Sequence, residues 1–312
     1  MLIKQADDKT SDIETLKSLL SHPAATADTK RKIEQAIRNI SAGAKGEQDA
    51  AYEINFHYGE SSKNWAVIHD LRLEHKGRVA QIDHLLISRF LDVWVCESKR
   101  FSEGISINEK GECAMFWNGK LTGIGSPHEQ NAKHCAVLKA LCDSGAVELP
   151  KRLGFSIKPS FNGLVVVSKN ARITRPKAKG WWDDGIVKAD QVKAKIDKAF
   201  DSDNNPLVMA KLVSAQTVES VARGLASLHV PASFDWHARF GLPKEPVRLV
   251  ATKPAPEPPT DATESKKTGC SCHSCGAMVE GKVVTFCVRF NKARFGGNVY
   301  CMECQSKFPK LA

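Results

Sequence analysis

Four stretches rich in apolar residues between positions 65 and 117 constrain the fold of this chain most strongly. They read WAVIHDLRL, VAQIDHLLI, LDVWVCESK and ECAMFW, and turn signals lie near Lys76-Gly77 and Lys110-Gly111. Apolar residues in this pattern predict β-strands. A later apolar run, NGLVVVS at 162–168, predicts one further strand, which we expect to be buried.

Apolar residues at helical spacing flank this strand-rich centre on both sides. Ser126 and Glu129 form a capping box around Pro127, and proline is favoured at the first position of a helix. The predicted helices are a hairpin within residues 11–41, a helix over about 46–58, a helix from Pro127 to about Cys142, and two helices over 190–200 and 206–228. Strands bracketed by helices in this way indicate an α/β or α+β fold.

Composition and charge exclude several classes of protein. The 312 residues are 42% hydrophobic and 26% charged, which is typical of globular domains and excludes a wholly disordered chain. No apolar run approaches the roughly 18 residues of a membrane span. The polar start MLIKQADDKT contains no readable secretory signal, so we expect a cytoplasmic protein without a membrane anchor. The net charge of +10 favours polyanionic partners.

A Pro-rich stretch divides the chain near its end. The segment KPAPEPPTDATESKK has four prolines and no apolar periodicity, which is typical of a semi-extended linker. We therefore expect five segments: a helical hairpin (1–41), a central domain (42–170), a helical extension (171–242), the linker (243–268) and a small cysteine-bearing module (269–312).

The two predicted strands on either side of Phe90 contain the most informative residues. If they form a hairpin centred on Phe90, directly opposed residues share one face of the sheet. That register places Asp83 opposite Glu97 and Gln81 opposite Lys99, with apolar pairs nearer the turn. Two carboxylates and an ammonium group are then expected side by side.

Two opposed acids on a mostly apolar surface repel each other and lose hydration. A divalent cation such as Mg²⁺ would relieve this cost, because one or two carboxylates bind it together with water and phosphate oxygens. Lys99 could then hold an attacking water or neutralise charge that develops on a phosphoryl group. The alternative is a solvated strand end on which Glu97 and Lys99 form an ordinary surface ion pair.

Four motifs in a fixed order place this hairpin in a wider context. They are G-x-x-G-E (43–47), Q-I-D-H-L-L-I-S (81–88), V-C-E-S-K (95–99) and S-P-x-x-Q-N (126–131). Over about residues 42–150 the chain resembles the nuclease-related domain (NERD) family, which is similar to the restriction-endonuclease-like PD-(D/E)xK nucleases. The resemblance implies a restriction-endonuclease-like core, with a central mixed sheet flanked by helices. It also implies metal-dependent cleavage of nucleic acid, with DNA favoured by analogy with that superfamily.

The same resemblance implies roles for individual residues. Asp83 and Glu97 would be ligands of Mg²⁺ or Mn²⁺, and Lys99 would be the catalytic lysine. Glu47, on the preceding helix, would be the additional acid of this nuclease class, and Gln130 would be a polar residue of the active site. Stabilisation by the helix dipole is the alternative explanation of Glu47. For Gln130 the alternative is satisfaction of free backbone groups in the first helical turn.

Six of the ten cysteines lie in the last 43 residues. Two C-x₂-C pairs, Cys272 with Cys275 and Cys301 with Cys304, can place four thiolates tetrahedrally around Zn²⁺. So short a module cannot build much apolar core, so we expect bound metal to supply its folding free energy. Cys270 is an alternative to Cys272 as a ligand.

The segment between the two cysteine pairs suggests strands and a contact with nucleic acid. Alternating apolar residues predict the strands of a zinc ribbon: Val283, Val284, Phe286, Val288 and Phe290. Interleaved basic and aromatic residues suit phosphate contact and base stacking: Arg289, Lys292, Arg294 and Phe295. A ribbon that docks a protein partner such as a helicase is the alternative.

These features lead to one main hypothesis and one alternative. We expect a metal-dependent nuclease that hydrolyses phosphodiester bonds in DNA, with a zinc ribbon that aids nucleic-acid binding. The alternative is a non-catalytic nucleic-acid-binding or scaffold protein. The presence of Asp83, Glu97 and Lys99 together argues against that alternative.

Overall fold

The computed structural model describes residues 1–308 except 61, 102, 203–205, 245–269 and 280. It divides into two compact units, Met1–Glu245 and Pro246–Ala312, and each is considered by itself. The Pro-rich linker expected at 243–268 lies outside the described residues from position 245 onward.

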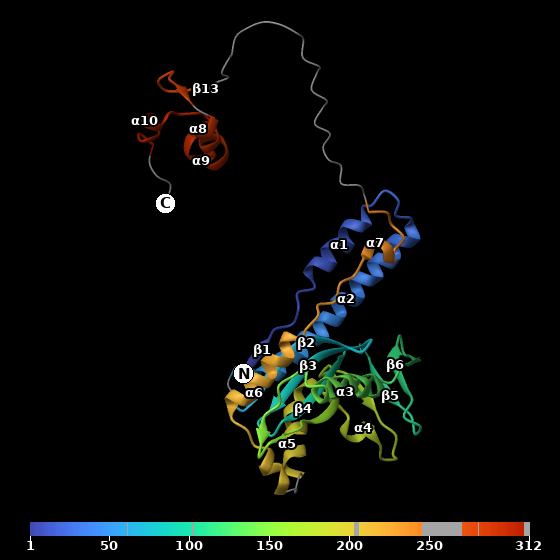
Figure 1. Ribbon diagram of the computed structural model, residues 1–312. Coiled ribbons are helices and arrows are strands. Elements are labelled where there is room, and N and C mark those ends of the chain that lie inside the picture. Colours follow the sequence, from blue (N-terminus) through green and yellow to red (C-terminus); the bar gives the residue numbers. More distant parts are fainter. Residues whose placement is uncertain (61, 102, 203–205, 245–269, 280, 309–312) are drawn as a thin grey trace. The chain divides into compact units, whose positions relative to one another are not determined.

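A six-stranded mixed sheet forms the centre of the first unit (Figure 1). Strands β2, β3 and β4 pair antiparallel, whereas β1, β10 and β12 each run parallel to a neighbour. The strands in order across the sheet are β1 (Leu2–Lys4), β2 (Trp65–His75), β3 (Arg78–Ser88), β4 (Asp92–Lys99), β10 (Ser160–Val167) and β12 (Ile186–Lys188). The expected strands in 65–99 and 162–168 are confirmed, and β1 and β12 were not expected.

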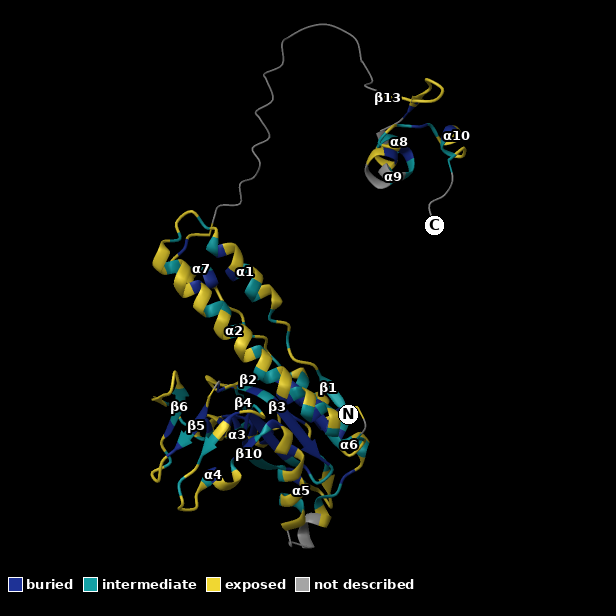
Figure 2. Ribbon diagram, turned by 180° about the vertical axis from the view of Figure 1, so that it is seen from behind, coloured by how far each residue is buried: buried dark blue, intermediate teal, exposed yellow. Residues whose placement is uncertain are grey.

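Helices cover both faces of this sheet, which confirms the α/β prediction. One face packs against α3 (Pro127–Asp143) and α6 (Ala215–Ser227). The other face packs against α2 (Ala27–Ile54) and α5 (Val192–Ser202). Figure 2 shows the central strands as buried and the outer sides of the helices as exposed. The expected capping box begins α3 with Ser126 Oγ, which accepts a hydrogen bond from the backbone N–H of Glu129.

A second, four-stranded sheet lies beside the first. Its strands in order are β11 (Arg172–Thr174), β5 (Gly104–Ile107), β6 (Cys113–Trp117) and β7 (Lys120–Ile124). Only β6 was expected from the sequence, because the other three strands are short and lack a clear apolar pattern. A separate apolar cluster, which includes Ile105 and Trp182 of α4 (Trp181–Asp184), joins this sheet to β10. Lys151–Arg152 (β8) and Phe155–Ser156 (β9) form a small hairpin.

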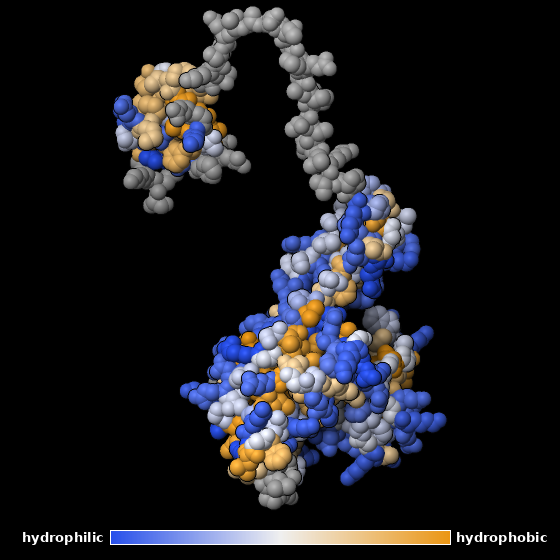
Figure 3. Space-filling view, in the orientation of Figure 1, coloured by the Kyte–Doolittle hydropathy of each residue, from blue (hydrophilic) through white to orange (hydrophobic). Residues whose placement is uncertain are grey.

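The N-terminal helices form an arm that projects from the central sheet (Figure 1). Here α1 (Thr10–Leu20), the first half of α2 and α7 (Trp236–Arg239) share a small core of their own. Much of the visible surface of the arm is hydrophilic (Figure 3). Residues 1–41 and 171–242 contribute strands to the central sheet, so neither segment is separate from it.

The prediction of separate helices before and after Gly43 and Gly46 was wrong, because α2 continues through both glycines. Each interior glycine costs a helix only about 1 kcal/mol, which packing of its two apolar ends can offset. At Gly46 the absence of a side chain is useful. A Cβ there would lie 2.9 Å from the Cβ of Arg100, so glycine lets α2 approach the end of β4 closely.

The second unit is mostly helical where strands of a ribbon were expected. The only strands in its described part are β13 (Cys270–Ser271) and β14 (Met278–Val279), followed by α8 (Gly281–Thr285), a π-helical segment (Phe286–Phe290), α9 (Lys292–Phe295) and α10 (Met302–Gln305). Val283, Val284 and Cys287 pack into the core of this unit at helical spacing. Phe286 and Val288 are exposed, so the apparent alternation in the sequence was misleading.

Candidate active site and cysteine cluster

The hairpin register around Phe90 is confirmed for four residue pairs, from Ile87 opposite Val93 to His84 opposite Cys96. The ladder ends there, so the expected pairs of Asp83 with Glu97 and of Gln81 with Lys99 are not formed as ladder pairs. Instead, Asp83 Oδ2 accepts a hydrogen bond of 2.7 Å from the backbone N–H of Ser98. The strands separate at the position of the two acids.

An interruption in the regular alternation of side chains along β2 and β3, here called the phase change, explains this separation. On each strand, two residues three positions apart pack on the same face of the sheet: Ile68 and Leu71 on β2, and Ile82 and Leu85 on β3. Regular alternation would place such residues on opposite faces. Between them the ladder omits the pair Asp70 and Asp83, and Asp70 has a φ of 50°. Both strands therefore rotate together where the acids lie.

Glu97 is buried at the end of β4 and bonded on one side only. Its Oε1 accepts hydrogen bonds from Lys99 Nζ at 2.7 Å and from Gln130 Nε2 at 2.8 Å. Its Oε2 lies 3.4 Å from Nδ1 of His134 without hydrogen-bond geometry, and no described residue hydrogen-bonds to it. The structure thus brings together Glu97, Lys99 and Gln130, and it adds His134, one turn beyond Gln130 on α3.

The two acids have opposite electrostatic environments. Burial, followed by the charges of Glu97 and Glu47, raises the pKa of Asp83 well above its usual range. Burial also acts to raise the pKa of Glu97, but contacts with His134 and Lys99 outweigh it and lower that pKa. The acids therefore titrate apart, with Glu97 the more readily ionised member of the pair.

Glu47 lies on α2 and lines a cavity of about 670 Å³ together with Asp83. Burial raises the pKa of Glu47, and the negative charges of Asp70 and Glu97 add to this effect. A position beside other acids in a cavity favours the functional explanation of Glu47 over simple stabilisation of a helix end. Glu47 also stands in the interior of α2, far from the helix N-terminus at Ala27.

A second cavity, of about 510 Å³, lies on the Lys99 side of the site. Its wall includes Lys99, Gln130, Lys133 and the first turn of α3. Lys99 is partly exposed, with 29% of its side-chain surface accessible, so its ammonium group can reach a molecule in this cavity. The backbone N–H groups at a helix N-terminus attract anions such as phosphate.

A divalent cation fits this donor set. Glu97 Oε2 is a buried carboxylate oxygen without a hydrogen-bond partner in the described part of the chain, and such atoms are costly to bury. Asp83 adds a second carboxylate of the type that Mg²⁺ and Mn²⁺ prefer. A cation would also offset the burial and the neighbouring negative charges that together raise the pKa of Asp83.

Two histidines form a buried polar chain behind Asp83. His69 Nε2 contacts Asn55 Oδ1 at 3.0 Å, the two rings meet at 2.8 Å through their Nδ1 atoms, and His84 Nε2 contacts Ser98 Oγ at 2.8 Å. Because Asn55 Oδ1 can only accept, protons must point from Ser98 through His84 and His69 to Asn55. Burial lowers the pKa of both rings, which is consistent with two neutral histidines.

Residues 42–168 match the family model of the nuclease-related domain (NERD). The chain contains a nuclease-related domain. The matched region includes all five of the predicted site residues: Glu47, Asp83, Glu97, Lys99 and Gln130. The wall of the first cavity also includes residues of the N-terminal segment outside the match, among them Lys9. No curated protein and no solved structure matches the chain.

Two residues beside the candidate site, His134 and Asp70, were not predicted from the sequence. His134 follows Gln130 by four positions, and this spacing places both on one face of α3. That spacing could have identified His134. Asp70 gave no comparable signal, because its importance depends on contacts with Gln81 and with a lysine far away in the sequence.

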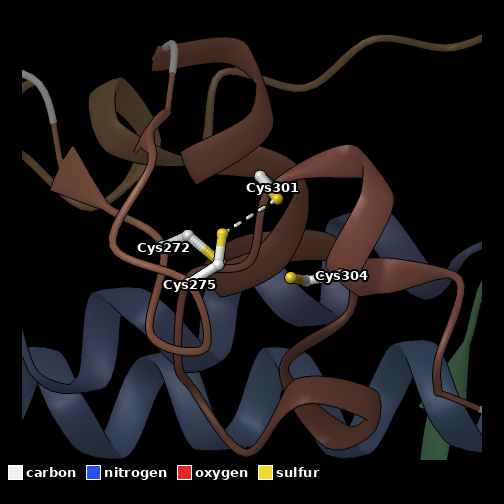
Figure 4. Close-up of side chains that lie close together, drawn as sticks. All are labelled: Cys272, Cys275, Cys301 and Cys304. Carbon is white, nitrogen blue, oxygen red and sulfur yellow. Dashed lines mark hydrogen bonds between the residues drawn. The ribbon is translucent and has the colours of Figure 1, made fainter.

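Four cysteines of the second unit converge as predicted (Figure 4). The Sγ atoms of Cys272, Cys275, Cys301 and Cys304 all lie within 4.8 Å of one another, and those of Cys275 and Cys301 are 3.6 Å apart. Burial opposes ionisation of Cys272, but hydrogen bonds from neighbouring backbone groups lower its pKa to about 6. This arrangement is suited to Zn²⁺, which binds four thiolates tetrahedrally.

The remaining cysteines of this unit lie outside the cluster. Cys270 is exposed and is not part of the four-thiol group, so the structure favours Cys272 as the ligand. Cys287 is buried in the core of the unit, where its thiol lies 3.5 Å from the carbonyl oxygen of Tyr300.

Of the four residues predicted to contact nucleic acid, two make contacts within this unit instead. Phe295 is only 2% exposed and packs among Tyr300 and Phe308, so it is not free to stack on bases. Arg294 donates hydrogen bonds to the backbone carbonyls of Gln305 and Phe308. The side chains of Arg289 and Lys292 lie outside the described part of the structure.

None of the described helices is long and apolar enough to cross a membrane.

Proposed function

We propose that this protein is a metal-dependent nuclease that hydrolyses phosphodiester bonds in DNA. The observation that carries the proposal is the meeting of Asp83, Glu97 and Lys99 at the point where β3 and β4 separate, within a nuclease-related domain. The choice of DNA rests on analogy with the restriction-endonuclease-like enzymes.

Asp83 and Glu97 would hold Mg²⁺ or Mn²⁺, with Glu47 on the same acidic side of the site. When bound, such a cation supplies a Lewis acid and lowers the pKa of a coordinated water. Glu97 is held for this role by Gln130 and Lys99, which both bond to its Oε1 and leave Oε2 free of hydrogen bonds among the described residues. Gln130 is thus a positioning residue for Glu97.

Lys99 is suited to act on the scissile phosphate. Its ammonium group is fixed 2.7 Å from Glu97 yet opens to the cavity beside α3. From there it can orient an attacking water and stabilise the negative charge that develops on the phosphoryl oxygens. Lys133 and the first turn of α3 line the same cavity, which supports an anionic substrate at this position.

For the second unit we propose a zinc-bound module that assists substrate binding. The four-thiol cluster supports the zinc, and the net positive charge of the chain supports attraction to a polyanion. Since Phe295 is buried and Arg294 bonds to backbone carbonyls of the module, neither residue is part of the proposed contact with nucleic acid. The alternative, a non-catalytic protein whose module docks a partner such as a helicase, has no specific observation in its favour.

The direct test is cleavage of plasmid or oligonucleotide DNA by the full chain with Mg²⁺ or Mn²⁺. We expect Lys99→Ala to reduce the cleavage rate by about 10³-fold, as for loss of a transition-state contact. Lys139→Ala is the matched control, since it removes an exposed lysine of α3 that pairs with Asp143 and lines neither cavity. Cleavage by Lys99→Ala at the wild-type rate would reject the assignment.

A further inference from the structure

A lysine from outside the nuclease-related domain enters the acidic side of the site. Lys9 precedes α1, and its Nζ lies 2.6 Å from Oδ2 of Asp70 in the centre of β2. The carboxylate is nearly inaccessible, with 6% of its side-chain surface exposed, and the lysine is 28% exposed. The match to the family covers residues 42–168, so Lys9 is a feature of this chain's own N-terminal segment.

Asp70 is held in position by contacts on both oxygens. Gln81 Nε2 donates a hydrogen bond of 3.1 Å to Oδ1, and Lys9 pairs with Oδ2. Gln81 lies two residues before Asp83 on β3, and Asp70 stands opposite Asp83 at the interruption of the ladder. Two acids in opposed positions repel each other, and the ion pair with Lys9 compensates one of them.

Lys9 also acts on Glu47. Two adjoining cavities share a wall that includes Lys9 and Glu47; one of them also exposes Asp83, and the other exposes Asp70. Among the charges that oppose the raised pKa of Glu47, that of Lys9 is the strongest. Burial alone would lower the pKa of Lys9, but the hydrogen bond and charge of Asp70 outweigh it and raise that pKa. Lys9 therefore remains a cation.

The acids of this region can be divided into two pairs. Asp83 and Glu97 have Lys99 beside them, and Asp70 and Glu47 have Lys9. The first pair includes the carboxylate oxygen that no described residue hydrogen-bonds, whereas both oxygens of Asp70 are bonded. In the second pair, Asp70 therefore has no oxygen that is left without a partner for a cation.

We propose that Lys9 is a positioning residue of the active site: its ammonium group neutralises Asp70 and Glu47, so the site binds one divalent cation at Asp83 and Glu97 and rejects a second. This inference rests on the proposed nuclease function and deepens it. Without the ammonium group of Lys9, the negative charges of Asp70 and Glu47 would attract a second cation. Lys9 takes the place of that cation.

The test is titration of the zinc-loaded full chain with Mn²⁺, with free Mn²⁺ counted by electron paramagnetic resonance. Wild type should bind one equivalent. Lys9→Met should gain a second equivalent, bound at least about tenfold more tightly than any second ion in wild type. Lys9→Gln keeps a hydrogen-bond donor for Asp70 but removes the charge, so it should behave like Lys9→Met even if the methionine variant folds poorly. Lys9→Arg should restore the single equivalent.

Lys45→Met is the matched control. Lys45 lines the cavity that contains Glu47 and Asp83, and its removal changes the net charge equally, but its partner Asp49 is exposed. This control should bind one equivalent. A single equivalent of unchanged affinity in Lys9→Gln, or a second equivalent in wild type or in Lys45→Met, would overturn the role of Lys9. Absence of Mn²⁺ binding by wild type would instead refute the metal site of the proposed function.

Discussion

Each unit of this protein contains a cluster of potential metal ligands, carboxylates in the first and thiols in the second. The two clusters differ in how much folded structure surrounds them. In the first unit, Asp83 and Glu97 lie on strands of a sheet whose two faces pack against helices, and Glu47 lies on one of these helices. In the second, four thiols are surrounded by only a few apolar side chains, among them Phe295 and Tyr300. The first fold should stand without its metal, whereas the second should depend on it.

This difference gives the metal a different role in each unit, chemistry in the first and folding in the second. A cation bound to the acids is available for chemistry, because the sheet already fixes the positions of its ligands. A cation bound to the thiols supplies the folding free energy that a small core cannot. The predictions that follow test this contrast, beginning with the largest expected effect.

Removal of zinc should unfold the second unit and leave the first folded. Structural zinc sites contribute roughly 10–16 kcal/mol to folding, more than so small a module has in reserve. Hydrogen exchange of the full chain with and without a zinc chelator would measure this. Protection should be lost over 270–308 and retained in β3, β4 and β10. Retained protection of α10 after complete zinc removal would contradict the contrast.

Within the second unit, Phe295 and Phe286 should differ in their contribution to stability. Phe295 is buried among aromatic side chains, so Phe295→Ala should destabilise the zinc-loaded module by about 3–5 kcal/mol. Phe286 is 43% exposed, and Phe286→Ala should have a much smaller effect. Limited proteolysis of the module in the two variants would compare them. Equal sensitivity would show that Phe295 is not a core residue.

The first unit should lose stability as the pH falls, through His69. Burial lowers the pKa of His69 to about 4, against about 6.5 when unfolded. Between these values the unfolded chain binds a proton that the folded chain does not, so stability falls as the pH falls from about 6.5 to about 4. The loss from this group should reach about 3 kcal/mol. Urea unfolding at several pH values would measure it.

His69→Gln isolates this effect, because glutamine does not titrate. The variant should show a shallower loss of stability between pH 6.5 and 4 than wild type, even if it is less stable at neutral pH. Identical slopes in the two proteins would mean that His69 is not held neutral by the fold.

The smallest expected effect concerns binding of nucleic acid by the second unit. Deletion of residues 268–312 should weaken binding to DNA and reduce the slope of log K against log salt by about 1–2, which corresponds to loss of one or two phosphate contacts from the six Lys and Arg residues of this segment. Cleavage at saturating DNA should remain. An unchanged slope would indicate that the module binds a protein partner.

The sequence could predict the hairpin register and the cysteine cluster, because each depends on local spacing. Alternation with a period of two fixed the pairing from Ile87 to His84, and the two C-x₂-C pairs identified all four clustered thiols. The phase change at Asp83 could not be predicted in the same way. It requires β2 and β3 to rotate together, and the pattern of one strand does not show this.

Other features could not be predicted because they join distant segments. Lys9 and Asp70 are separated by 61 positions, and no periodic pattern links them. The helical segment between the cysteine pairs was missed for another reason. Valine and phenylalanine favour strands, but the position of Cys287 relative to Val283 and Val284 gives a helical face that only the packing of the module shows.

The central claim is that the acids of the first unit form a metal site for cleavage, and Asp83→Asn tests it most directly. Asparagine can still accept the hydrogen bond from Ser98 but cannot supply a carboxylate. We predict loss of Mn²⁺ binding and of DNA cleavage with thermal stability equal to or above that of wild type, since a buried acid with a raised pKa is removed. Metal-dependent cleavage at the wild-type rate by folded Asp83→Asn protein would contradict the account.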